Sequence, residues 1–305
     1  MAKSGAPQGD MTVIGEIANP PFARLPDPGQ LFRDRAERFR FLAERNELRP
    51  YLLFLADIAD AQSHVQSDLP APLLPDTATL KRARDFAMPP LDRERFAADA
   101  VFETTFDRLL SFLGEIDMPE EASTALARLR ADVPLTSGEM VRAILSHAIP
   151  MEMLAEHVFV AAALQVHFAR LASHLVAKSL VAVGDGVCPV CGGPPVSSMV
   201  VGWQGAHGTR YCACALCGTL WNYVRIKCTL CGSTEGISYQ EIEGGPGTVK
   251  AETCKICRGY VKILHQHIDP AVDPVADDVA SLGLDLLLRG SDFRRGGVNP
   301  FLLGY

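Results

Sequence analysis

The chain of 305 residues lacks any apolar run long enough to cross a lipid bilayer, and it lacks an excess of positive charge. Its most apolar window, residues 158–166, is much shorter than the about 20 residues that a membrane helix needs. We therefore expect no stable membrane insertion, and we interpret this window as part of a buried helix. The formal net charge of −7 argues against a nucleic-acid partner, because such binding needs Lys and Arg to neutralise phosphates.

Cysteine is absent before residue 188 and after residue 257, although the sequence contains nine cysteines. Residues 1–10 contain no apolar segment that could form the core of a secretory signal, so we expect a cytoplasmic protein. Cytoplasmic thiols are kept reduced, which argues against structural disulfides. A glycine-rich phosphate loop, a serine nucleophile elbow and an H-E-x-x-H motif are also absent. We therefore predict that the protein is not an enzyme.

The hydrophobic content of 48% is enough to bury a core, and the sequence pattern predicts an α+β fold. Asp27 and Pro28 begin an amphipathic helical region, and the longest predicted helix covers residues 150–183. Further helices are expected from Pro50 and over residues 91–116, 120–131, 137–147 and 275–289. The predicted parts are an all-helical domain at 1–184, two tandem rubredoxin-like or zinc-ribbon modules at 185–226 and 227–268, and a C-terminal helix and tail at 269–305.

Eight cysteines form four C-x-x-C pairs, and the last two pairs repeat the first two with an offset of 40 residues. The pairs are Cys188/Cys191, Cys214/Cys217, Cys228/Cys231 and Cys254/Cys257. Two thiolates on a tight turn can bind one tetrahedral ion, and a glycine after the second cysteine permits the turn. Arg258 takes this glycine position in the fourth pair, so we expect its turn to differ. We predict one four-cysteine metal site per module; an interleaved arrangement across modules is the alternative.

Four thiolates in tetrahedral geometry suit either zinc or a single iron, and the sequence leaves this choice open. They leave no coordination position for a hydrolytic water, so the predicted sites are structural or electron-transferring. Redox-active dithiols are an alternative interpretation, but such motifs normally occur singly beside a βαβ pattern. Because modules of about 40 residues are too small to fold on a hydrophobic core alone, we expect two metal ions to hold this region together.

Cys212 and the helical histidines lie outside this pattern. The repeat counterpart of Cys212 is Glu252, so we interpret Cys212 as a small buried residue; a redox-sensitive thiol or substitute ligand is the alternative. His157, His167 and His174 do not share one helix face, so packing is their expected role.

The residues around the cysteines form a distinctive set of motifs. They are Cys188-Pro189-Val190-Cys191-Gly192, Tyr211-Cys212, Leu220-Trp221, Val224-Arg225, Lys227-Cys228, Ala276-Asp277-Asp278-Val279-Ala280-Ser281-Leu282 and Asn299-Pro300-Phe301-Leu302. This set resembles the formate dehydrogenase accessory protein E family. The resemblance implies a cytoplasmic protein needed for active respiratory formate dehydrogenase, contact with its catalytic subunit before export, and rubredoxin-like knuckles able to hold iron.

Three functions follow as hypotheses. The first is an assembly or maturation factor whose metal modules form a platform for the formate dehydrogenase catalytic subunit. The second is a rubredoxin-like electron carrier, which leaves a large helical half unexplained. The third is a zinc-ribbon protein that binds nucleic acid; residues 188–264 carry a net charge of only +3, spread too thinly for a surface that follows phosphates.

Overall fold

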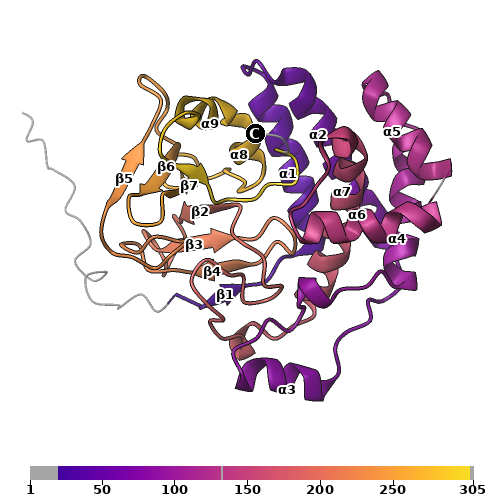
Figure 1. Cartoon of the computed structure of the whole chain (residues 1–305), viewed down its shortest axis with the longest axis horizontal. Helices are drawn as coiled ribbons and strands as arrows, with labels where there is room; N and C mark the ends of the chain where they lie inside the picture. The colour runs from indigo at the N-terminus through magenta and orange to yellow at the C-terminus, as the bar shows by residue number, and fades with distance from the viewer. Residues whose placement is uncertain (1–19, 132, 303–305) are drawn as a thin grey trace, which may run out of the picture.

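The structure is a computed structural model that describes residues 20–131 and 133–302. A layer of helices lies on one side of the molecule and a mixed β-sheet on the other, with the C-terminal helices beside the sheet (Figure 1). This arrangement agrees with the predicted α+β class. The expected lack of a secretory signal in residues 1–10 falls outside the described residues.

The helical layer is built from amphipathic segments of the first half of the chain. Its helices are α1 (Pro28–Ala43), α2 (Arg49–Val65), α3 (Thr77–Asp85), α4 (Ala100–Leu113), α5 (Glu120–Ala131), α6 (Val133–Leu145) and α7 (Leu154–Ser173). Short 3-10 turns lie at Gln66–Asp68, Arg93–Arg95, Met151–Met153 and Ala177–Ser179. Asp27 caps α1 as predicted, since its Oδ1 accepts a hydrogen bond from the Gly29 amide at 3.0 Å.

Two of the predicted helices are shorter than expected. The prediction for residues 91–116 is wrong at its start, because α4 begins only after Asp99, whose carboxylate accepts a bond from the Phe102 amide at 2.7 Å. Helix α7 does not continue to residue 183, because the chain turns extended at Val176. Helix α3 had no counterpart in the sequence-based prediction.

Helix α7 lies at the centre of the helical layer and is buried on nearly all sides. It packs against α4, α5, α6 and α2, which confirms that residues 158–166 belong to a buried helix. Within residues 20–131 and 133–302, no helix combines the length and apolar character that crossing a bilayer requires.

The strands of the two repeats form one continuous sheet. The strands are β1 (Ala23–Arg24), β2 (Ser197–Val200), β3 (Arg210–Ala213), β4 (Leu220–Asn222), β5 (Ile237–Gln240), β6 (Val249–Cys254), β7 (Gly259–His265) and β8 (Arg294–Arg295). They are ordered β1-β4-β3-β2-β7-β6-β5, with β8 beside β7. Each repeat contributes the expected hairpin, and the parallel pair β2–β7 joins the repeats, with Ser198 opposite Ile263.

The predicted helix at 275–289 is two short helices, α8 (Ala276–Ala280) and α9 (Leu282–Leu288). The break has a visible cause in Lys262 of β7, whose buried ammonium donates to the carbonyl oxygens of Asp278 at 2.7 Å and Ser281 at 3.1 Å. A continuous helix would use such carbonyls for its own amides.

Buried ion pairs tie helix α1 to the C-terminal part of the chain. Arg38 binds both carboxylate oxygens of Asp277, at 2.8 and 2.6 Å, and Arg35 binds Asp273 at 3.2 Å. Both arginines are buried, so these pairs are well shielded from water. Helices and sheet are therefore held in one frame around the cysteine turns.

Candidate metal centres

The eight paired cysteines come together as two groups, one in each repeat. The groups are Cys188, Cys191, Cys214 and Cys217, and Cys228, Cys231, Cys254 and Cys257. Within each group the sulfur atoms all lie within 4.8 Å of one another. The sulfurs thus gather within repeats, as the 40-residue offset predicts, and the interleaved arrangement is not found.

The spacing of the sulfurs fits a tetrahedral ion. In the first group the Cys188 and Cys217 sulfurs lie 3.6 Å apart, and the Cys191 and Cys214 sulfurs 3.4 Å apart. In the second, the equivalent pairs lie 3.8 and 3.9 Å apart. A metal–sulfur bond of about 2.3 Å in tetrahedral geometry places neighbouring sulfurs about 3.8 Å apart. The donor set and its spacing therefore fit zinc or a single iron.

The first three cysteine pairs lie on the same tight turn, stabilised by the same backbone hydrogen bonds. The Cys188 amide donates to Gly193 O at 2.8 Å and the Gly192 amide to Cys188 O at 3.0 Å. In the second repeat, the Cys228 amide donates to Ser233 O at 2.7 Å and the Gly232 amide to Cys228 O at 3.0 Å. Gly192 completes its turn with a φ of 78°, in the left-handed region.

The difference expected at Arg258 does not lie in its backbone angle. Its φ of 57° lies in the same left-handed region as the glycines of the other turns. A residue with a Cβ is strained there by about 1 to 2 kcal/mol. The long side chain finds room because it projects into solvent, where it pairs with Asp292 at 3.1 Å. The repeat geometry therefore prevails over the local preference for glycine.

The two groups differ in their access to water. All four cysteines of the first are buried, whereas Cys231 and Cys257 of the second are exposed. Burial raises the pKa of the Cys188 thiol, while hydrogen bonds from its three neighbours lower that of Cys214. Four adjacent thiolates cannot persist in a buried site without positive charge, which a bound cation supplies.

Cys212 lies outside both groups and is fully buried on β3, between Ser198 and Trp221 of the adjacent strands. Burial raises the pKa of its thiol to about 12, with the nearby Arg210 acting in the opposite direction. The interpretation as a small buried residue is confirmed, and no ligand role is indicated.

The packing role predicted for the helical histidines is confirmed for His157 and His167, both buried. The His157 ring bonds to Met153 O at 2.6 Å. The His167 ring lies among Phe96, Phe102 and Phe168, with centroid distances of 5.3 to 6.0 Å. This apolar setting lowers its pKa to about 4.

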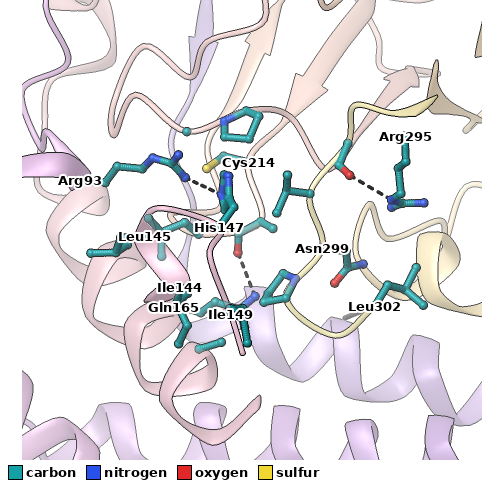
Figure 2. A pocket seen from close by; sticks show the side chains of 18 of the residues that line it. Arg93, Ile144, Leu145, His147, Ile149, Gln165, Cys214, Arg295, Asn299 and Leu302 are labelled. Carbon is teal, nitrogen blue, oxygen red and sulfur yellow. Dashed lines mark hydrogen bonds between the residues drawn. The ribbon is translucent and has the colours of Figure 1, made fainter. Parts of the chain in front are cut away.

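Sequence reasoning missed a cavity of about 280 Å³ beside the first group, where the helical half, the first repeat and the C-terminal tail meet (Figure 2). The Arg93 guanidinium donates to His147 Nε2 at 2.7 Å near Cys214. The backbone amide of Arg93 donates to Cys191 O at 3.1 Å. Gln165 of α7, which also lines the cavity, donates to Ala215 O at 2.9 Å. No spacing pattern marks these residues, because they come from distant segments. Together they line the space beside Cys214.

Comparisons with known proteins cover the whole described chain. The family descriptions "FdhE, N-terminal", "FdhE, central domain" and "FdhE, C-terminal domain" match residues 20–185, 187–225 and 226–302. A "Protein FdhE homolog" of Rhizobium meliloti (strain 1021) is 45% identical over 301 residues, 98% of each chain. One of Enterobacter sp. (strain 638) is 39% identical over 278 residues, 89% of this chain and 88% of that protein. The crystal structure of the FdhE protein from Pseudomonas aeruginosa superposes with a TM-score of 0.83 at 30% identity, covering 93% of this chain and 99% of that one.

Proposed function

The chain belongs to the FdhE family, and on that premise we propose that it is a cytoplasmic accessory protein for the maturation of respiratory formate dehydrogenase. It acts on the catalytic subunit of that enzyme and has no turnover of its own. The observation that carries this proposal is the presence of two closed four-sulfur groups on one sheet, in a chain that matches the family along its length.

The metal ions in this proposal are held by the eight cysteines of the two groups. Each ion cross-links two turns, and iron would in addition carry one electron. Four thiolates complete a tetrahedron, so a bound ion has no free position for substrate water. The sites therefore support a folded surface for a client enzyme rather than hydrolysis.

A second function, rubredoxin-like electron transfer, is favoured by one observation: Cys231 and Cys257 of the second group are exposed. Exposed ligands bring an ion close to a redox partner. Protein purified without air distinguishes the two functions by metal content and spectrum. A reversible visible absorption from iron would support electron transfer, whereas colourless zinc would exclude it.

Complementation of cells that lack this protein tests the maturation role. We expect such cells to lose formate dehydrogenase activity, and the native chain to restore it. Replacing Cys188 and Cys191 together by Ala leaves two unpaired thiols in the first group, so activity should stay low. Cys212→Ala is the matched control, because Cys212 is equally buried but lies outside both groups, and it should restore activity. Full enzyme activity in cells without the protein would refute the proposal.

A further inference from the structure

The internal repeat allows equivalent surfaces of the two repeats to be compared. In the first repeat, helix α7 covers the turn of residues 214–217. Gln165 of α7 donates through Nε2 to Ala215 O at 2.9 Å, and Leu216 packs against the main hydrophobic core. The Ala215 carbonyl of this turn thus binds a helix of the same chain, and the Leu216 side chain packs on the core of the same chain.

The equivalent turn of the second repeat, residues 254–257, is open. Lys255 and Ile256 are the counterparts of Ala215 and Leu216, and both are exposed, Ile256 to 61%. Cys257 and Cys231 are exposed beside them. Strands β5 and β6 lie on the side of the sheet remote from α7, so the helical layer does not reach this turn (Figure 1).

Ile256 and Lys255 together define the chemistry of a fitting partner. An exposed isoleucine on a rigid turn offers apolar area to a binding surface. At the position where Ala215 contacts α7 in the first repeat, the second repeat has the positively charged Lys255. A helix as apolar as α7 would therefore not suit the second turn. A helix with carboxylates beside its apolar stripe would neutralise the charge.

We infer that the knuckle face, formed by Cys231, Lys255, Ile256 and Cys257, binds an acidic amphipathic helix of a partner protein. The inference rests on the proposed function, and the partner is the formate dehydrogenase catalytic subunit. The apolar stripe of the helix packs on Ile256, a carboxylate pairs with Lys255, and a side-chain amide or hydroxyl donates to the Lys255 carbonyl, as Gln165 does for Ala215. The first repeat shows that such a turn can seat a helix.

Capture of the purified catalytic subunit by metal-loaded full chains tests this face. Ile256→Asp and Lys255→Glu change exposed side chains and leave all eight cysteines in place. We expect each to weaken capture about tenfold or more while metal content stays at the native level. Phe86→Asp is the matched control, because Phe86 is 72% exposed at the end of α3, a helix that lies away from β5 and β6 (Figure 1), and it should bind like the native chain.

The outcomes separate this inference from the proposed function. Native-like capture by both knuckle-face variants overturns the inference and leaves the maturation role standing. No capture by the native chain overturns the inference too, and complementation of cells still judges the maturation role by itself. Protection of the amides of residues 254–258 from hydrogen exchange when the subunit is added supports the inference, whereas protection confined to other segments contradicts it.

Discussion

At the scale of single residues, the fold suppresses the protonation of one buried histidine, His167. His167 is 1% exposed, and its Nδ1 has no hydrogen-bond partner among the described residues. Its ring is surrounded by phenylalanines, and burial lowers its pKa to about 4, with the neighbouring Asp99 acting in the opposite direction. Folding therefore keeps this histidine neutral at a pH where the unfolded chain is protonated.

We predict that His167 makes the folded state less stable as the pH falls. Its pKa is about 4 in the folded chain and 6.5 in the unfolded one, so between these values only the unfolded chain takes up this proton. The resulting slope approaches about 1.4 kcal/mol per pH unit. Urea unfolding measures this at pH 7 and pH 5.5. The free energy of unfolding of His167→Phe, relative to that of the native chain, should be higher at pH 5.5 than at pH 7. The exposed His174→Phe is the control, and an equal pH response of both variants would contradict the prediction.

At the scale of elements, one buried ion pair connects the two repeats. Arg210 on β3 binds Glu252 on β6 at 2.9 Å across β2 and β7, and both side chains are almost completely buried. Arg210 also donates to Ser198 on β2 at 3.0 Å. Because two strands separate the paired residues, the pair fixes how the hairpins of the two repeats lie relative to each other.

Glu252→Ala should lower the free energy of unfolding by about 3–5 kcal/mol, because it leaves the Arg210 guanidinium buried without a counter-charge. A second replacement, Arg210→Met in the same chain, removes that charge and should recover most of the loss. Denaturant unfolding of native, single and double variants at equal metal content measures both effects. A double variant no more stable than Glu252→Ala would show that the unpaired charge is not the cause.

Local patterns predicted the elements that depend on local chemistry. The cap at Asp27, the buried helix around residues 158–166 and the cysteine turns each follow from neighbours in the sequence. The junction of the repeats could not be predicted, because β2 and β7 pair residues that are far apart in sequence. The break between α8 and α9 depends on Lys262, which reaches it from another element. The cavity with Arg93 and His147 escaped prediction for the same reason.

At the scale of the whole molecule, the first sulfur group lies within the same hydrophobic core as the helices, and the second lies nearer the surface. Cys188, Cys191, Cys214 and Cys217 pack with residues of α1, α2, α4 and α7. The two ions of the proposed function therefore stabilise different amounts of structure. We therefore expect the helical half to be independent of the ion at the second site but not of the ion at the first.

Chelation should remove the two ions in separate phases. The ion at the second group should leave first, because Cys231 and Cys257 are open to the chelator. Its loss should leave the helical circular dichroism unchanged, whereas the slow loss of the other ion should reduce it. A colour-forming chelator and stopped-flow dichroism follow both events. Cys228→Ser with Cys231→Ser should abolish only the fast phase; release of both ions at one rate would contradict this assignment.

The pairing of helix α1 with the C-terminal part of the chain has a consequence for synthesis on the ribosome. Arg38 and Asp277 are 239 residues apart, and the Tyr51 hydroxyl bonds to Phe301 O, 250 residues away, at 2.6 Å. Strand β1 likewise pairs with β4, which is synthesised much later, with Ala23 opposite Trp221. A growing chain can form individual helices early but cannot close this structure until the residues that pair with α1 and α2 have been synthesised. A chain that stops before Asp273 therefore leaves Arg35 and Arg38 without their carboxylates, and we expect proteases to cut such a fragment faster than the full chain.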